Sequence, residues 1–178
     1  GEVDAPARRT EAGRVAFGYA AESNAHFESL SGRYNAVFFA RAGGVPRAAA
    51  HTAVSELMHA LGLIHDADRP VAEYSFGARR KLTLVEALTH SPRVLLLDEP
   101  TVGLDPIQIE QIRNLIIDLG RSKKHTIILS THILSEVKAT CDRIVMIAHG
   151  KIAADASIAD LEAEQRLLVV LNEPAKRA

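Results

Sequence analysis

The sequence predicts an α/β fold in which a parallel sheet is covered by helices and a helical subdomain is inserted into the framework. Short apolar runs alternate with amphipathic segments from residue 93 onward. These runs are apolar on both faces, which is typical of central strands in a parallel sheet. Residues 27–61 carry their apolar residues at helical spacing instead. A repeating strand–helix pattern with a helical insertion follows from these three observations.

The first half of the chain is expected to be mostly helical. Its only strand-like run is short, at residues 15–17. Residues from about 23 to 73 are expected to form the inserted subdomain, in which four apolar residues at helical spacing mark one amphipathic helix. These residues are Val54, Leu57, Met58 and Leu61.

The second half of the chain supplies the strand–helix repeat. Apolar runs at 94–97, 126–129 and 144–148 are expected as strands of the parallel sheet. A helix is expected between the first two runs, with Gly120 placed to end it. Its apolar face is Ile109, Ile112, Leu115, Ile116 and Leu119. Residues 149–151 are expected to form a hairpin turn between the run at 144–148 and a last short strand at 152–154.

Composition and charge narrow the functional classes. Hydrophobic residues make up 47% of the chain and charged residues 24%, which is ordinary for a globular protein. The 21 basic and 22 acidic residues give no net attraction to nucleic acid or to an anionic membrane. No apolar stretch approaches the roughly 18–20 residues that span a bilayer, so a membrane role would require a partner. The single cysteine, Cys141, excludes an internal disulfide and suits the cytoplasm.

Two carboxylates at the end of an apolar strand are the strongest chemical signal. Asp98 and Glu99 follow the run at 94–97, and ligands of open α/β sheets bind beyond the carboxyl ends of the strands. An aspartate there can hold Mg²⁺, and the next glutamate can orient or deprotonate a water. The alternative is that Asp98 caps the following turn and Glu99 is solvated. For an isolated strand-plus-acid pattern this alternative is the more common one.

The motifs around Asp98 and Glu99 favour a functional role for these acids over a structural one. Residues 98–100, Asp-Glu-Pro, resemble the Walker B motif of ATP-binding-cassette (ABC) ATPases, and residues 103–105 resemble the D-loop. Residues 75–78, Ser-Phe-Gly-Ala, resemble the signature motif, and His132 resembles the switch histidine. The four motifs stand in the order and at the spacing of the family. The chain is therefore similar to the nucleotide-binding domain of an ABC transporter.

The resemblance implies roles for individual residues. Glu99 and His132 are expected to be catalytic, acting on the attacking water and the γ-phosphate of ATP. Asp98 is expected to hold Mg²⁺, and so is Glu22, which stands where the family's Q-loop has glutamine. A solvated loop glutamate is an equally good interpretation of Glu22. The residues expected to bind nucleotide are Ser75, Phe76, Gly77, Ala78 and Asp105.

The signature motif departs from the family's familiar Leu-Ser-Gly-Gly-Gln. This chain has Tyr74 first, Phe76 third and Ala78 fifth, whereas Ser75 and Gly77 are retained. A hydroxyl, free amides and the helix dipole at a helix N-terminus favour a phosphate, and glycine lets the backbone approach it. We therefore expect an altered nucleotide contact rather than its abolition. In the family this motif contacts the nucleotide of a partner subunit.

One motif of the family is missing from the 178 residues. The only Gly-Lys pair, at 150–151, is followed by isoleucine and lacks the upstream glycine of a phosphate-binding loop. The fold is thus expected to be a P-loop NTPase-like core of the ABC ATPase type that is N-terminally incomplete. The fragment alone is expected to be inactive.

The resemblance also gives expected boundaries. Residues 1–22 would be a remnant of the N-terminal core up to the Q-loop, and residues 23–73 the helical subdomain. Residues 74–158 would hold the signature helix and the ATPase core with its Walker B motif, D-loop and switch histidine. Residues 159–178 would begin a C-terminal extension.

The expected function is that of an ATP-hydrolysing motor subunit, with ATP and Mg²⁺ as cofactors. Residues 103–116 and 129–137 are most similar to ABC-2-type exporters, including the gliding-motility group. The expected partners are a membrane-spanning transporter subunit, which would hold the protein at the inner face of the cell membrane, and a second ATPase subunit. The alternative is a non-hydrolytic remnant that serves as an interaction module for a membrane partner. Neutral charge and the lack of a coiled-coil insertion disfavour a nucleic-acid partner.

Overall fold

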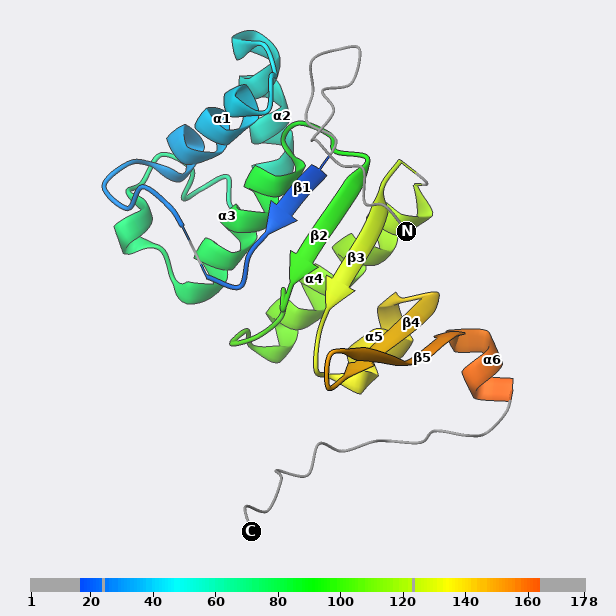
Figure 1. Cartoon of the computed structure of the whole chain (residues 1–178). Coiled ribbons are helices and arrows are strands. Elements are labelled where there is room, and N and C mark those ends of the chain that lie inside the picture. Colours follow the sequence, from blue (N-terminus) through cyan, green and yellow to red (C-terminus); the bar gives the residue numbers. More distant parts are fainter. Residues whose placement is uncertain (1–16, 24, 123, 164–178) are drawn as a thin grey trace. The chain divides into compact units, whose positions relative to one another are not determined.

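The computed structural model describes residues 17–23, 25–122 and 124–163 (Figure 1). The chain divides into two compact units, Gly1–His132 and Ile133–Ala178, and each is described by itself. The expected strand at 15–17 and the expected C-terminal extension lie mostly outside the described residues.

The first unit is built on a three-stranded parallel sheet in the order β1-β2-β3. The strands are β1 (Phe17–Ala20), β2 (Val94–Asp98) and β3 (Thr126–Ser130). At the end of the ladder Asp98 lies opposite Ser130. Because all three strands run in the same direction, their carboxyl ends meet at one edge of the sheet (Figure 1).

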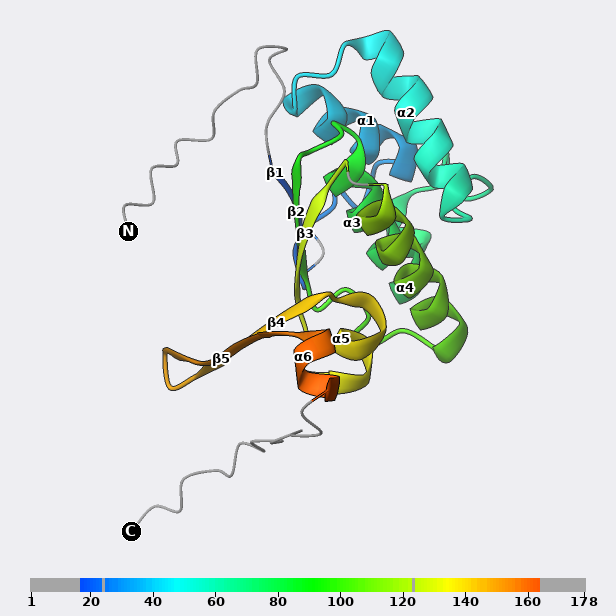
Figure 2. The ribbon, with the colours of Figure 1, turned by 90° about the vertical axis from the view of Figure 1, so that its right-hand side faces the viewer.

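The helices of this unit lie on one side of the sheet, as Figure 2 shows. They are α1 (Gly32–Ala42), α2 (Arg47–Ala60), the 3₁₀ helix η1 (Val71–Glu73), α3 (Phe76–Leu88) and α4 (Pro106–Arg121). Helix α3 contacts β1 on one side and α1 and α2 on the other. The core is continuous from α1 and α2 through α3 to the buried side chains of Leu95 and Leu97 on β2. The fold is therefore α/β, as predicted.

Three of these helices begin at a polar side chain. Ser31, Ser75 and Asp105 each accept a hydrogen bond from the backbone N–H three residues further on. Such caps satisfy an N–H that has no partner inside the helix, and Pro106 at the start of α4 needs none. Two of the three capping residues, Ser75 and Asp105, are residues that the sequence predicts to bind nucleotide.

The opposite face of the sheet differs from the prediction. Phe17, Tyr19 and Ile128 are 40%, 58% and 56% exposed, so among the described residues only one face of the sheet is covered by helices. Helix α4 also differs, because it continues through Gly120 and ends at Arg121, with Ser122 as its C-cap. Gly120 has open space around its Cα, and its backbone stays helical without any steric demand for glycine.

The second unit contains α5 (Leu134–Thr140), β4 (Arg143–Ala148), β5 (Lys151–Ser157) and α6 (Ile158–Ala163). Among the described residues β4 pairs only with β5, in a separate antiparallel sheet, so the prediction of a parallel strand at 144–148 is wrong. The predicted turn between this strand and the next is confirmed. His149 and Gly150 connect the two strands with φ angles of 51° and 72°. A two-residue turn of this kind returns the chain at once and allows only antiparallel pairing. None of the described helices is long and apolar enough to cross a bilayer.

Candidate functional site

Asp98 is held between two hydroxyl groups at the carboxyl edge of the sheet. The Tyr19 hydroxyl donates to its Oδ2 at 3.3 Å, and the Ser130 hydroxyl donates to its Oδ1 at 2.6 Å. These donors come from β1 and β3, the two neighbours of β2. The pKa of the Tyr19 hydroxyl is raised, first by desolvation and then by the Asp98 carboxylate. Parallel pairing thus gives the Asp98 carboxylate a fixed orientation.

Glu99 leaves the strand in a strained backbone conformation. Its φ angle is 46°, in the left-handed region that costs a residue other than glycine about 1–2 kcal/mol. Its N–H donates to the backbone carbonyl of Ser130 at 3.1 Å. This hydrogen bond anchors the turn that follows β2 to the end of β3.

The carboxylate of Glu99 contacts His132. Oε1 of Glu99 lies 2.8 Å from Nδ1 of His132, whose side chain is 72% exposed. The other oxygen, Oε2, is buried and has no hydrogen-bond partner among the described residues. A buried carboxylate oxygen without a donor is rare in folded proteins and fits a site completed by a water or a ligand. The two residues expected to be catalytic are therefore brought together.

Glu22 and Phe76 share a pocket with Asp98. The pocket is open, has a volume of about 410 Å³ and lies at the carboxyl ends of β1 and β2. It is lined by Tyr19, Ala21, Glu22, Ser23, Phe76, Arg80, Asp98 and Val102. The two residues predicted to hold Mg²⁺, Glu22 and Asp98, thus face the same space. Among the described residues, no cluster of three or more His, Cys, Asp or Glu side chains could bind a metal ion by itself.

The other predicted nucleotide-binding residues lie around the starts of α3 and α4. The Ser75 hydroxyl accepts from the Ala78 N–H at 3.2 Å, and Asp105 accepts from the Gln108 N–H at 2.9 Å. Both side chains therefore act as helix caps in this conformation. A Cβ at Gly77 would come within 2.6 Å of the side chain of Gln108. Glycine at this position lets the start of α4 approach the signature motif closely.

Phe76 brings the predicted signature motif into contact with the predicted D-loop of the same chain. A Cβ at Gly103 would lie 2.6 Å from Cε1 of Phe76, and Gly103 has a φ angle of 78°. The phenylalanine that departs from the family's signature thus lies against the D-loop glycine. It remains 51% exposed, so it is available to another surface.

Arg80 is a buried cation that the sequence analysis did not single out. It is 2% exposed, and its guanidinium on α3 donates only to backbone carbonyls. The acceptors are Ala21, Glu22, Asp98, Glu99 and Pro100. Burial lowers the pKa of Arg80, and the carboxylates of Glu22, Asp98 and Glu99 act in the opposite direction.

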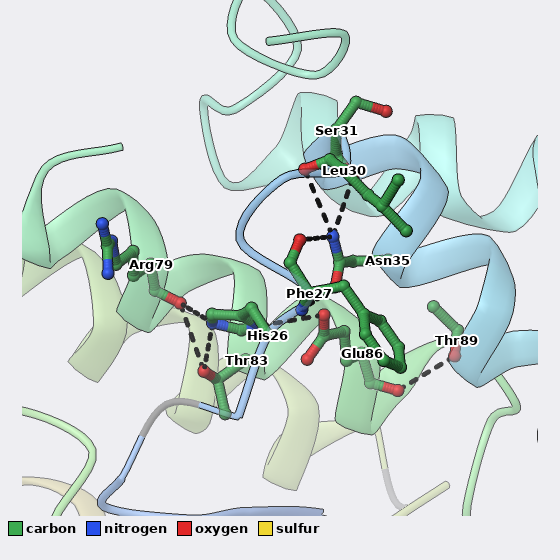
Figure 3. A network of polar contacts seen from close by, with 9 residues as sticks. All are labelled: His26, Phe27, Leu30, Ser31, Asn35, Arg79, Thr83, Glu86 and Thr89. Carbon is green, nitrogen blue, oxygen red and sulfur yellow. Dashed lines mark hydrogen bonds and ion pairs between the residues drawn. The ribbon is translucent and has the colours of Figure 1, made fainter. Parts of the chain in front are cut away.

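A second buried network fastens the segment after Glu22 to α3 (Figure 3). Nδ1 of His26 lies 3.2 Å from Oε1 of Glu86, and Nε2 of His26 lies 3.2 Å from the carbonyl oxygen of Arg79. The pKa of Glu86 is raised by burial, and its contact with His26 opposes that rise. Asn35 extends the network by donating to the carbonyls of Phe27 and Ser31. No sequence pattern predicts this network, because His26 and Glu86 are 60 residues apart.

The chain is similar to known proteins that bind ATP. The family model described as ABC transporter matches residues 2–102. The chain is 34% identical over 140 residues to the bacitracin transport ATP-binding protein of Bacillus licheniformis, a match that covers 79% of this chain and 45% of that protein. It is 36% identical over 137 residues to a fluoroquinolones export ATP-binding protein of Mycobacterium tuberculosis, with 77% and 44% covered. The chain thus spans less than half the length of these relatives.

A solved structure gives the same result for the fold. The chain matches cbiO1 from Clostridium perfringens, part of the ABC transporter complex cbiONQ, with a TM-score of 0.72. The two are 28% identical, and the match covers 84% of this chain and 60% of that one. The family match, the ATP-binding relatives and the shared fold agree with the acid pair at the sheet edge. The chain therefore belongs to the ABC transporter family, as part of an ATP-binding subunit.

Proposed function

We propose that the protein containing this chain is the ATP-hydrolysing motor subunit of an ABC-2-type exporter. The observation that carries the proposal is the contact between Glu99 and His132 beside Asp98, with Oε2 of Glu99 buried and without a hydrogen-bond partner in the part of the chain that the structure describes. The names of two relatives, a bacitracin transport protein and a fluoroquinolones export protein, support a role in transport, and the second name supports export. The phosphate-binding loop that the 178 residues lack would have to be supplied by another segment.

Glu99 acts on the attacking water in this proposal. The His132 imidazole donates through Nδ1 to Oε1 of Glu99 and fixes the carboxylate. Oε2 then accepts a proton from the water that attacks the γ-phosphate. The strained backbone at Glu99 is consistent with such a role, because strain concentrates where a side chain must be held in one position.

The donor set at the pocket fits Mg²⁺. The carboxylates of Glu22 and Asp98 line one open space, and Mg²⁺ prefers one or two carboxylates together with phosphate oxygens and water. When bound, the ion would neutralise negative charge on the phosphates of ATP. The Tyr19 and Ser130 hydroxyls would keep the Asp98 carboxylate oriented toward it.

The signature residues serve the nucleotide of a second ATPase subunit. Ser75, Phe76, Gly77 and Ala78 stand at the N-terminal end of α3, which is 13 residues long and presents free N–H groups and a positive dipole end. Asp105 at the start of α4 lies close by, because Gln108 of α4 reaches Gly77. In a dimer with a two-fold axis, the signature residues and Asp105 of each copy would contact the ATP bound by the other copy.

Residues 23–73 are proposed to meet the membrane-spanning subunit. Four exposed apolar side chains of this segment form the apolar patch: Phe27, Leu30, Tyr34 and Phe38 are 46%, 36%, 56% and 45% exposed. The rings of Phe27 and Phe38 pack edge to face with centroids 5.2 Å apart. Exposed apolar clusters on a soluble domain are typical of partner surfaces. This contact would place the chain on the inner face of the cell membrane.

Subunit mixing tests the shared ATP site. The proteins to be used carry a phosphate-binding loop joined to this chain, and the wild type is expected to hydrolyse ATP in the presence of Mg²⁺. Glu99→Gln and Ser75→Arg should each be inactive as separate proteins. When the two variants are mixed in equal amounts, half of the dimers contain one copy of each variant. Each of these mixed dimers has one intact site out of two, so about a quarter of wild-type hydrolysis should return. Mixing that restores no activity would refute the shared site, and an inactive wild type would refute the proposed function.

A further inference from the structure

Arg80 joins two parts of the chain that the sequence keeps far apart. From α3, its Nη1 donates to the carbonyls of Ala21 at 2.6 Å and Glu22 at 2.7 Å. Its Nη2 donates to the carbonyls of Asp98 at 3.0 Å and of Glu99, and its Nε donates to that of Pro100 at 3.3 Å. One guanidinium therefore holds the segment that carries Glu22 against the turn that carries Glu99.

This arrangement uses the properties that distinguish arginine from lysine. The guanidinium is planar, presents five N–H donors in a fixed fork and remains charged when buried. A lysine ammonium has three donors at a single point and cannot reach two separate sets of carbonyls at once. Arg80 is 2% exposed, and its contacts are all to the backbone. The contacts therefore fix the course of the chain and do not depend on which side chains the two segments carry.

The contact with Glu99 bears on hydrolysis directly. Glu99 has its left-handed backbone anchored on both sides, because its N–H donates to Ser130 and its carbonyl accepts from Arg80. The carbonyl also accepts from the Val102 N–H at 3.3 Å, which closes the turn. Removal of the guanidinium would leave the strained residue with fewer restraints, and its carboxylate would leave the position 2.8 Å from His132.

We propose that Arg80 is a positioning residue for ATP hydrolysis, which holds the Glu99 backbone in its left-handed conformation and ties it to the backbone of Glu22. The proposal rests on the proposed function. Arg80 contacts neither water nor nucleotide in this role and acts through Glu99. Its loss should therefore affect the chemical step more than the binding of ATP.

The neighbouring Arg79 provides a matched control. It lies on the same helix, and its guanidinium also donates to backbone carbonyls, those of Ala72 and Tyr74, as well as to the Glu28 carboxylate. These acceptors belong to residues 28–74, away from the turn at 98–100. Arg79→Met thus removes a comparable set of hydrogen bonds from α3 without releasing Glu99.

The first readout is steady-state hydrolysis by proteins that carry a phosphate-binding loop. Arg80→Met should lower kcat by at least about tenfold and leave KM for ATP within about threefold, because misplaced catalytic groups cost rate rather than binding. Arg80→Lys should restore the thermal stability lost in Arg80→Met without restoring kcat. Arg79→Met should leave kcat within about twofold of the wild type.

The second readout uses the 178-residue chain and needs no ATP. It is hydrogen–deuterium exchange at the backbone amide of Glu99, which is protected by its hydrogen bond to Ser130. The exchange rate should rise about tenfold or more in Arg80→Met and stay unchanged in Arg79→Met. If Arg80→Met does not fold, Arg80→Lys takes its place in both measurements, with the same directions expected.

The outcomes separate the two proposals. The positioning role would be overturned if the Arg80 variants kept the wild-type kcat or changed only KM for ATP. It would also be overturned if the Arg79 and Arg80 variants accelerated hydrogen exchange at the Glu99 amide equally. A wild-type protein that does not hydrolyse ATP would overturn the proposed function. The exchange measurement would still decide whether Arg80 holds Glu99.

Discussion

Glu99 and His132 follow neighbouring strands of one parallel sheet, and Nδ1 of His132 lies 2.8 Å from Oε1 of Glu99. The pairing exists because β2 and β3 end at the same edge, with Asp98 opposite Ser130. Taken separately, Glu99 could be an acidic residue in a turn, and His132 could be an ordinary surface histidine. Oε2 of Glu99 has no hydrogen-bond partner within residues 17–23, 25–122 and 124–163, so the two residues form an arrangement suited to holding a water.

Replacement of the switch histidine should slow hydrolysis. In a protein that carries a phosphate-binding loop, His132→Ala leaves Glu99 without the donor to Oε1, and the rate should fall by about 10²-fold. His51→Ala is the control, because His51 is exposed on α2 and should leave the rate unchanged. A steady-state phosphate assay measures both. Equal rates for the two variants would show that His132 does not support Glu99.

The buried pair of His26 and Glu86 should make stability depend on pH. Burial raises the folded-state pKa of Glu86 above its ordinary value of 4.5, so the folded state binds a proton that the unfolded state has released. The stability associated with protonated Glu86 is complete below pH 4.5 and is lost as pH rises through the raised pKa. Glu86→Gln cannot ionise and should escape this loss.

Urea unfolding at a series of pH values measures the effect. The stability difference between Glu86→Gln and the wild type should shift in favour of the variant as pH rises above 4.5. Glu56→Gln, an exposed position on α2, should show no such shift. A Glu86→Gln difference that is the same at every pH would mean that Glu86 does not titrate in this range.

Two glycines should respond in opposite directions to alanine. A Cβ at Gly18 would lie 2.2 Å from the carbonyl oxygen of Ala87, which belongs to the backbone of α3 and cannot rotate away. Gly18→Ala should therefore lower the free energy of unfolding by about 1–3 kcal/mol. A Cβ at Gly120 would meet nothing within 4 Å, so Gly120→Ala should raise the free energy of unfolding by about 0.5–1 kcal/mol. Denaturant unfolding tests both, and a neutral Gly18→Ala would contradict the close approach of β1 to α3.

The sequence predicted those parts of the fold that local pattern determines. The strand before Asp98, the helix after Pro106 and the residues at the carboxyl edge all have patterns of apolar spacing, caps or adjacent acids. The role of Gly120 and the place of residues 144–148 in the parallel sheet were predicted wrongly, because glycine is tolerated inside a helix and an apolar run does not determine which strand it pairs with. The turn at His149 and Gly150 was predicted correctly.

The interactions that sequence reasoning missed are long-range and lack a pattern of their own. Arg80 reaches the carbonyl of Glu22 across 58 residues, and His26 reaches Glu86 across 60. Backbone carbonyls are present at every residue, so a side chain that binds them leaves no complementary residue to recognise. Burial of an arginine becomes apparent only when the structure packs α3 against β1 and brings Arg80 to the carbonyls of the turn at 98–100.

The apolar patch on residues 23–73 should mediate contact with a membrane-spanning subunit. Tyr34→Glu together with Phe38→Ser places charge and polarity on this surface, and binding to a co-expressed membrane subunit should fall by about tenfold or more. Ile107→Ser is the control, because Ile107 is 70% exposed on α4, outside the patch. Co-purification from detergent measures the association. Retention of the double variant together with loss of the Ile107 variant would move the interface away from the patch.

Single-turnover hydrolysis by Glu99→Gln tests the central claim most directly. In a protein that carries a phosphate-binding loop, this variant should bind ATP with wild-type affinity and release phosphate at least about 10²-fold more slowly, because glutamine cannot accept the proton of water. Glu110→Gln, an exposed position on α4, should match the wild type in both measurements. Phosphate release by Glu99→Gln at the rate of Glu110→Gln would contradict the assignment of the chemistry to the carboxylate beside His132.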